Sequence, residues 1–171
     1  MELRDLEDGV TWLKQQPYVD SAHIIMSGWS YGGFMTTYAL THSTSWSAGI
    51  AGGPVTDWRD YDTIYTERYM GLLGDNLSGY EQSSAVENAT KLDGHLLMIH
   101  SMMDDNVHPQ NTMQLFTAFT NAGKDIEARI YPPGRHGAAY NGESARLIGE
   151  AQFDFLSRWL GKVPPREKIR P

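Results

Sequence analysis

The sequence predicts an α/β fold, in which helices flank a mostly parallel sheet of about four strands. Short apolar runs alternate along the chain with longer segments whose apolar residues recur at helical spacing. Such alternation favours parallel strands joined by right-handed helical crossovers. The chain has 171 residues, of which 40% are hydrophobic, so we expect a single domain over 1–171.

The helices are predicted from apolar stripes and from their end signals. A first stripe predicts a helix over about 3–16, which Pro17 ends. Residues 54–93 show no clear long period, and we interpret them as an excursion with one short helix near 64–71. Further helices are expected over 31–42, 109–122 and 143–160.

The strands are predicted from short apolar runs between these helices. Segment 46–53 is rich in glycine, alanine and serine, which permits tight packing beneath helices. Segment 96–100 is continuously apolar, as expected of a strand that is buried on both faces. The four predicted strands are 24–27, 46–53, 96–100 and 125–131.

The composition limits the partners and the compartment. The formal net charge of −7 disfavours nucleic acid and anionic membrane surfaces. No apolar stretch approaches the ~20 residues that a membrane span needs, and no signal peptide is visible, so we expect a cytoplasmic protein if the chain is complete. Without cysteine, neither disulfides nor cysteine-bound metal can hold the fold.

The most informative motif is Gly-Trp-Ser-Tyr-Gly-Gly at residues 28–33, between the first predicted strand and the helix 31–42. This is the layout of a nucleophile elbow, in which a strained turn lifts a serine hydroxyl above the end of a sheet. Gly28 and Gly32 lie two residues to either side of Ser30, where we expect a side chain to collide. The sequence therefore predicts Ser30 as a nucleophile rather than an ordinary loop serine.

The other residue types that a nucleophilic serine needs follow later strands. Asp104 and Asp105 come after strand 96–100, and His136 comes after strand 125–131. In an open α/β sheet, ligands bind beyond the carboxyl ends of the strands. A histidine can take the serine proton while a carboxylate holds the imidazole. The order Ser, Asp, His is the one found in α/β-hydrolases.

Six histidines compete for the role of the base. His136 is favoured because it lies in a loop after the last strand, next to Gly137. His108 is its competitor, but it is close to the acid and is expected to begin a helix. His100 lies within a strand and is interpreted as a packed core residue. The remaining three, at element edges, are His23, His42 and His95.

Two acidic segments could alternatively hold a metal. Residues 104–108 offer oxygen ligands, but they lack both EF-hand spacing and a second ligand cluster. The carboxylates of Asp57, Asp60 and Asp62 could likewise offer oxygen ligands to calcium. We favour solvated acidic loops, and we expect neither a metal nor another cofactor.

Three segments together resemble the C-terminal catalytic domain of the prolyl oligopeptidase family, closest to its dipeptidyl peptidase IV branch. They are the serine motif, the run Tyr-Asp-Thr-Ile-Tyr-Thr-Glu-Arg-Tyr-Met-Gly at 61–71, and Asp-Asp-Asn-Val-His at 104–108. The similarity extends from about residue 3 to 160. It implies a truncated α/β-hydrolase fold.

The resemblance implies a role for each matching residue. Ser30 is the nucleophile, Asp104 rather than Asp105 is the acid, and His136 is the base. The N–H of Tyr31 is one oxyanion donor, and Asn106 binds a substrate carbonyl. The pocket for the residue before the cleaved bond is formed by Tyr61, Tyr65, Trp58, Val55 and Val107. Core packing is the alternative for these aromatic residues, above all for Trp58.

The chain also departs from the family. It lacks the N-terminal β-propeller, the first sheet strands and the upstream tyrosine that completes the oxyanion hole. Ser101 replaces the glycine that usually follows His100. If the chain is complete, strand 24–27 is an exposed sheet edge, and we expect a homodimer or higher oligomer that extends the sheet.

We therefore expect a serine hydrolase that forms an acyl-enzyme on a peptide or ester substrate. The resemblance implies a dipeptidyl peptidase that cleaves after proline or alanine. A stand-alone esterase acting on short acyl esters is the first alternative, because esters have a better leaving group than amides. A non-catalytic scaffold that retains the fold is the second.

Overall fold

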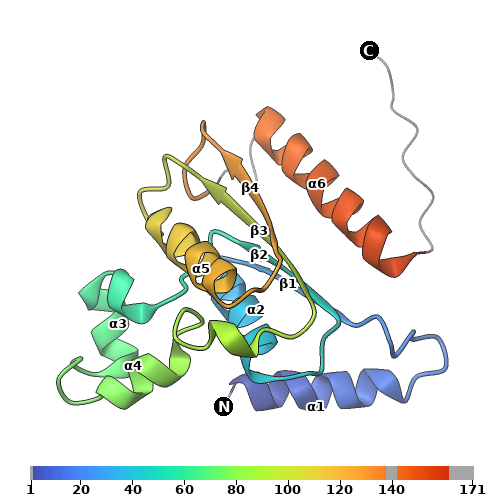
Figure 1. The fold of residues 1–171 in the computed structure, drawn as a ribbon, viewed down its shortest axis with the longest axis horizontal. Coiled ribbons are helices and arrows are strands. Elements are labelled where there is room, and N and C mark those ends of the chain that lie inside the picture. Colours follow the sequence, from blue (N-terminus) through green and yellow to red (C-terminus); the bar gives the residue numbers. More distant parts are fainter. Residues whose placement is uncertain (1, 138–141, 162–171) are drawn as a thin grey trace.

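The computed structural model describes residues 2–137 and 142–161 and has an α/β architecture (Figure 1). Its sheet contains four parallel strands in the order β1-β2-β3-β4. The strands are β1 (Ile25–Trp29), β2 (Ala48–Gly52), β3 (His95–Ser101) and β4 (Glu127–Tyr131). The predicted fold class, a mostly parallel sheet flanked by helices, is confirmed.

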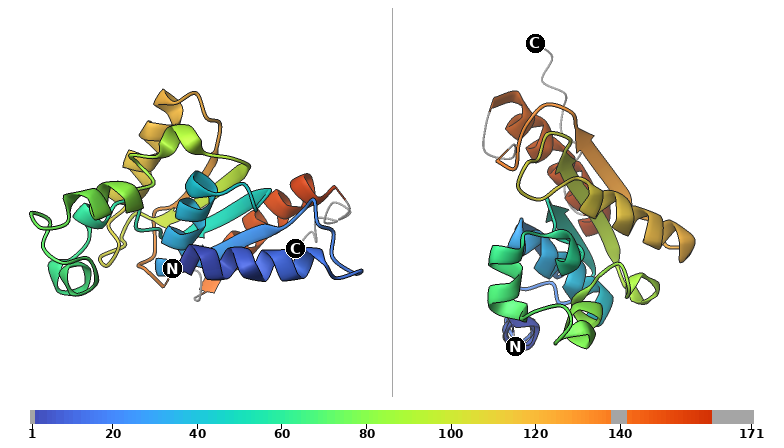
Figure 2. Two further views of the ribbon diagram at one scale, coloured as in Figure 1. Left: turned by 90° about the horizontal axis from the view of Figure 1, so that it is seen from below. Right: turned by 90° about the vertical axis from the view of Figure 1, so that its left-hand side faces the viewer.

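The helices form layers on both faces of the sheet (Figure 2). On one face, α2 and α5 contribute Leu40 and Phe119 to a core built on β2 and β3. On the other face, α6 contributes Ile148 and Phe155. The helices are α1 (Glu2–Lys14), α2 (Tyr31–His42), α3 (Thr63–Met70), α4 (Leu77–Ser83), α5 (Gln110–Asn121) and α6 (Gly142–Leu160), with short 3-10 turns at Trp58–Asp60 and Ala89–Lys91.

Most predicted elements are present, with shifted ends. The strand expected over 46–53 is the five-residue β2, and all of its residues are buried. The one described α-helix that the sequence analysis does not predict is α4, which lies within segment 54–93. This helix has seven residues, only Tyr80 is buried, and Asn76 makes no side-chain cap. Such a short helix gives no readable periodicity. None of the helices in the described ranges combines the length and apolar character needed to cross a bilayer.

The strand β1 lies at one edge of the sheet and pairs only with β2 among the described strands. No described strand lies on the outer side of β1, and a sheet edge of this kind can pair with a further strand. We therefore propose that the 171-residue chain self-associates through β1. Light scattering at micromolar concentration should give more than one chain mass.

A substitution on β1 tests this edge directly. Ser27 is exposed there, and Ser27→Lys should favour the monomer because an edge lysine opposes strand pairing. The control is Thr120→Lys on the exposed face of α5, which adds the same charge elsewhere. A single-chain mass for the unsubstituted protein would contradict the proposal.

Ser101 closes β3 with a buried hydroxyl. Its side-chain oxygen has no hydrogen-bond partner among the described residues, which is unfavourable in a packed interior. We expect Ser101→Ala to raise the free energy of unfolding by about 1 kcal/mol. Thr56→Val is the matched control, since Thr56 Oγ1 donates to the Asn111 carbonyl at 2.8 Å. The control should lose stability in denaturant titrations, and a loss in both variants would show that the Ser101 hydroxyl is satisfied.

Candidate active site

Ser30 occupies a strained turn between β1 and α2. Its φ of 61° and ψ of −116° make it the only non-glycine residue with positive φ in the described ranges. The turn is fixed by two backbone bonds, since Ser30 N donates to the Gly52 carbonyl at 2.8 Å and Phe34 N donates to the Ser30 carbonyl at 2.9 Å. Such strain persists where the surrounding structure imposes it, and it is common at functional sites.

The glycines around Ser30 differ in their constraint. A Cβ on Gly28 would lie 2.4 Å from the Gly32 carbonyl carbon, which confirms the expectation for Gly28. The expectation for Gly32 is wrong, because a Cβ there would meet nothing within 4 Å. Gly33 is the residue that cannot carry a side chain, because a Cβ there would lie 2.6 Å from the Gly52 carbonyl oxygen. The first turn of α2 therefore packs directly against the end of β2. In the sequence, only Gly33, the second glycine of Gly32-Gly33, indicates this contact.

Asp104 and His136 form a direct contact. The His136 Nδ1 atom lies 2.7 Å from Asp104 Oδ2, and the Asp104 side chain is only 1% exposed. The other carboxylate oxygen, Oδ1, accepts from the backbone N–H groups of Asn106 and Val107, each at 3.0 Å. Because both carboxylate oxygens are engaged, the acid is held in one orientation toward the imidazole.

A contact from β1 links the histidine loop to the elbow. The indole Nε1 of Trp29, the residue before Ser30, donates to the His136 carbonyl at 2.8 Å. Ser30, Asp104 and His136 thus follow the carboxyl ends of β1, β3 and β4, at one rim of the sheet. Open parallel sheets bind their ligands at this edge, beyond the carboxyl ends of the strands.

The competing residues occupy other environments. Asp105 is exposed and pairs with Arg135 Nη1 at 3.0 Å. His108 is also exposed, and its Nδ1 accepts from Gln110 N at 3.3 Å. His100 is fully buried, as predicted, and burial lowers its pKa. Sequence reasoning missed that its Nε2 also lies 3.2 Å from Asp104 Oδ2.

The three aromatic residues among the expected pocket residues pack against one another. The rings of Trp58 and Tyr65 stack at 5.8 Å between centroids, and Tyr61 meets each of them edge-on. Val55, Val107 and Trp58 are buried in one core cluster, while Tyr65 is 38% exposed. Trp58 therefore packs in the core, as its alternative interpretation holds, and also lines a cavity of about 510 Å³ together with Tyr31 and Tyr65.

The side chain of Asn106 is oriented by Tyr61. The Tyr61 hydroxyl donates to Asn106 Oδ1 at 2.6 Å. Burial, with a smaller contribution from the Asp62 charge, raises the pKa of Tyr61, so its hydroxyl stays protonated at neutral pH. With Oδ1 engaged as acceptor, the amide nitrogen of Asn106 is left to donate. Tyr31 opens α2, so its N–H has no acceptor within the helix.

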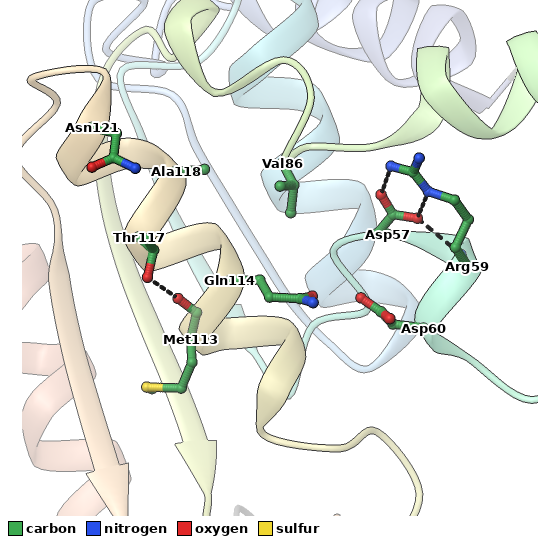
Figure 3. Close-up of a pocket in the computed structure, with 9 residues that line it drawn as sticks. All are labelled: Asp57, Arg59, Asp60, Val86, Met113, Gln114, Thr117, Ala118 and Asn121. Carbon is green, nitrogen blue, oxygen red and sulfur yellow. Dashed lines mark hydrogen bonds and ion pairs between the residues drawn. The ribbon is translucent and has the colours of Figure 1, made fainter.

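A second cavity, of about 570 Å³, lies between the segment 57–60 and α5 (Figure 3). None of the expected site residues lines it. At its edge the guanidinium of Arg59 faces the buried carboxylate of Asp57, with Arg59 Nε donating to Asp57 Oδ1 at 2.8 Å (Figure 3). Ser84 Oγ donates to the other oxygen at 2.6 Å, and Arg59 also contacts Glu87. This network anchors the turn that carries Trp58.

Asp57 is thus engaged by a cation and a hydroxyl. Among the described residues, no group of three or more His, Cys, Asp or Glu side chains could hold a metal ion. Burial acts to raise the pKa of Asp57, but hydrogen bonds from Arg59 and Ser84 outweigh it, and the pKa lies below its usual value. The charged carboxylate therefore stabilises the fold.

We expect Asp57→Asn to lower the free energy of unfolding by about 2 kcal/mol at pH 7, because the charge-assisted bonds are lost. A lowered pKa in the folded state contributes stability that is present above the unfolded value, near 3.9, and is lost as the pH falls through the folded value. Denaturant titrations should therefore show the difference shrinking below about pH 4.

The control is Asp62→Asn. Asp62 caps α3 by accepting from Tyr65 N at 2.8 Å, and asparagine caps equally well, so stability should hardly change. Equal stabilities of Asp57→Asn and the unsubstituted chain at pH 7 would contradict this role for Asp57.

The chain is similar in sequence and in fold to known proteins. Over 165 residues the chain is 42% identical to a protein named probable dipeptidyl-aminopeptidase B from Talaromyces marneffei, covering 93% of this chain and 18% of that protein. It matches dipeptidyl peptidase 4 of Porphyromonas gingivalis with a TM-score of 0.88 and 40% identity, covering 92% of this chain and 22% of the other. An acylaminoacyl peptidase of Pyrococcus horikoshii, 24% identical, shares the fold with a TM-score of 0.84 over 98% of this chain and 29% of its own.

The chain thus spans less than a fifth of the length of the curated relative from Talaromyces marneffei, of which it covers 18%. Residues 1–163 match the family model described as the prolyl oligopeptidase family. The chain belongs to the prolyl oligopeptidase family.

Proposed function

We propose that this chain carries the acyl-transfer site of a dipeptidyl-peptidase-like serine hydrolase, with Ser30 as nucleophile, His136 as base and Asp104 as orienting acid. The observation that carries the proposal is the 2.7 Å contact between His136 Nδ1 and Asp104 Oδ2, on a loop that Trp29 ties to the serine turn. A strained serine and an oriented imidazole that follow strands of the same sheet are the groups that nucleophilic catalysis needs.

The reaction proceeds in two halves. Ser30 Oγ attacks the substrate carbonyl carbon while His136 Nε2 takes the hydroxyl proton, and Asp104 stabilises the imidazolium that forms. The Tyr31 N–H donates to the oxyanion. His136 then gives its proton to the leaving group, and an acyl-serine remains. A water molecule, deprotonated by the same histidine, releases the acyl group by the reverse sequence.

The aromatic group suggests the substrate. Trp58, Tyr61 and Tyr65 present flat ring surfaces beside the rim, which suit the compact ring of proline or the methyl group of alanine. The Asn106 amide, oriented by Tyr61, donates to a carbonyl of the substrate. Relatives named dipeptidyl-aminopeptidase B and dipeptidyl peptidase 4 support a dipeptidyl peptidase activity.

A fluorophosphonate probe tests the triad. We expect mass spectrometry to find the label on Ser30, and Ser30→Ala to abolish it. His136→Ala and Asp104→Asn should slow labelling by about 10³-fold or more, because the base or its orientation is lost. His108→Ala and Asp105→Asn are the matched controls, since both side chains are exposed and should leave labelling unchanged.

Chromogenic substrates distinguish the remaining alternatives. Hydrolysis of Gly-Pro-p-nitroanilide indicates the peptidase, and hydrolysis of p-nitrophenyl butyrate alone indicates an esterase on the same triad. Equal labelling of Ser30 in His136→Ala and in the unsubstituted chain would contradict the proposed triad. A complete lack of label in the folded chain would favour the scaffold alternative.

A further inference from the structure

Two imidazoles face the same carboxylate oxygen. His136 Nδ1 lies 2.7 Å from Asp104 Oδ2, and His100 Nε2 lies 3.2 Å from the same atom. The two histidines differ in setting, because the His100 side chain is completely buried while that of His136 is 20% exposed. The mechanism described above makes no use of His100.

The position of His100 follows from the alternation of β3. Leu96, Met98 and His100 point to the face covered by α2 and α5, while Leu97 and Ile99 point to the α6 face. His100 is therefore brought against α5, where its Nδ1 lies 2.7 Å from Thr112 Oγ1. Its other nitrogen points toward the loop that carries Asp104.

The hydrogen bonds determine which nitrogen of His100 carries the hydrogen. Nε2 lies 2.8 Å from the Val107 carbonyl and near Asp104 Oδ2, and both of these atoms can only accept. Nε2 must therefore donate, and Nδ1 accepts from the Thr112 hydroxyl. Burial keeps the ring neutral, because it lowers the pKa of His100 despite the nearby carboxylate.

These contacts enclose Asp104. Val107 accepts from His100 through its carbonyl and donates through its own N–H to Asp104 Oδ1 at 3.0 Å. The N–H of His100 thus holds Val107, whose own N–H binds Asp104 Oδ1, and it also faces Asp104 Oδ2. It therefore helps to hold Oδ2 where it can accept from His136.

We propose that His100 is a positioning residue, which holds Asp104 in the orientation that receives His136 Nδ1. This inference rests on the proposed triad. It differs from a purely structural role in one respect, namely that losing the His100 donor weakens the Asp104–His136 bond even in a chain that stays folded.

Proton NMR of the 171-residue chain tests this without any substrate. The Nδ1 proton of a histidine bonded to a carboxylate gives a signal far downfield, and its loss in Asp104→Asn assigns it. We expect His100→Leu to weaken the signal or move it upfield. His100→Gln, which keeps an N–H donor of similar reach, should restore it.

The matched control is His42→Leu. His42 is another partly buried histidine, whose ring nitrogens lie 2.9 Å from the carbonyls of Tyr38 and Gln82, and it makes no contact with Asp104 among the interactions described. This variant should lose stability but leave the downfield signal unchanged. A folded His100→Leu variant with an unchanged signal would overturn the proposal.

Two further readouts keep the outcome decisive. Long-range proton–nitrogen correlation on the unsubstituted chain should show neutral His100 with its hydrogen on Nε2, and a hydrogen on Nδ1 would overturn the proposal even if His100→Leu failed to fold. Fluorophosphonate labelling of Ser30 should fall about ten-fold in His100→Leu and recover in His100→Gln. If the unsubstituted chain takes no label, the proposed function fails, while the NMR measurements still decide the role of His100.

Discussion

The buried carboxylate of Asp104 is the group on which the rest of the site depends. An ionised carboxylate in a protein interior is unfavourable unless donors surround it. Here two backbone N–H groups engage one oxygen and two imidazoles face the other. These donors come from β3, from the loop after it and from the loop after β4, so the order of the parallel sheet is what assembles them.

The same rim holds the serine and the aromatic group, each by a different device. Ser30 is held by backbone bonds in a conformation that few residues adopt. The turn that carries Trp58 is fixed by hydrogen bonds of Asp57 with Arg59 and Ser84. None of these three residues is among the proposed site residues. Rigid supports of this kind hold the reacting groups in the geometry that the reaction needs, which lowers the entropic part of the barrier.

Local patterns in the sequence predicted much of this arrangement. Apolar periodicity located the four strands and most helices, and the elbow motif located Ser30 between a strand and a helix. The pairing of His136 with Asp104, rather than Asp105, followed only from the family resemblance, since adjacent aspartates carry the same local signal. The helix α4 was missed because it is short and carries a single buried residue.

The remaining features depend on contacts between distant residues. Asp57 meets Ser84 across 27 positions, and Tyr61 meets Asn106 across 45, so neither partner is readable from local sequence. The constraint at Gly33 arises from Gly52 on a neighbouring strand, so the serine motif alone, which points to Gly32, does not reveal it. The spacing of four between His100 and Asp104 was visible, but only the turn between them makes it a contact.

A crystal structure of the chain phosphonylated at Ser30 would show whether the serine, the imidazole and the carboxylate form one relay. We expect the Nε2 atom of His136 within hydrogen-bond distance of Ser30 Oγ or of an adduct oxygen, with Nδ1 still bonded to Asp104. An imidazole turned away from the adduct, with Asp104 bonded elsewhere, would contradict this expectation.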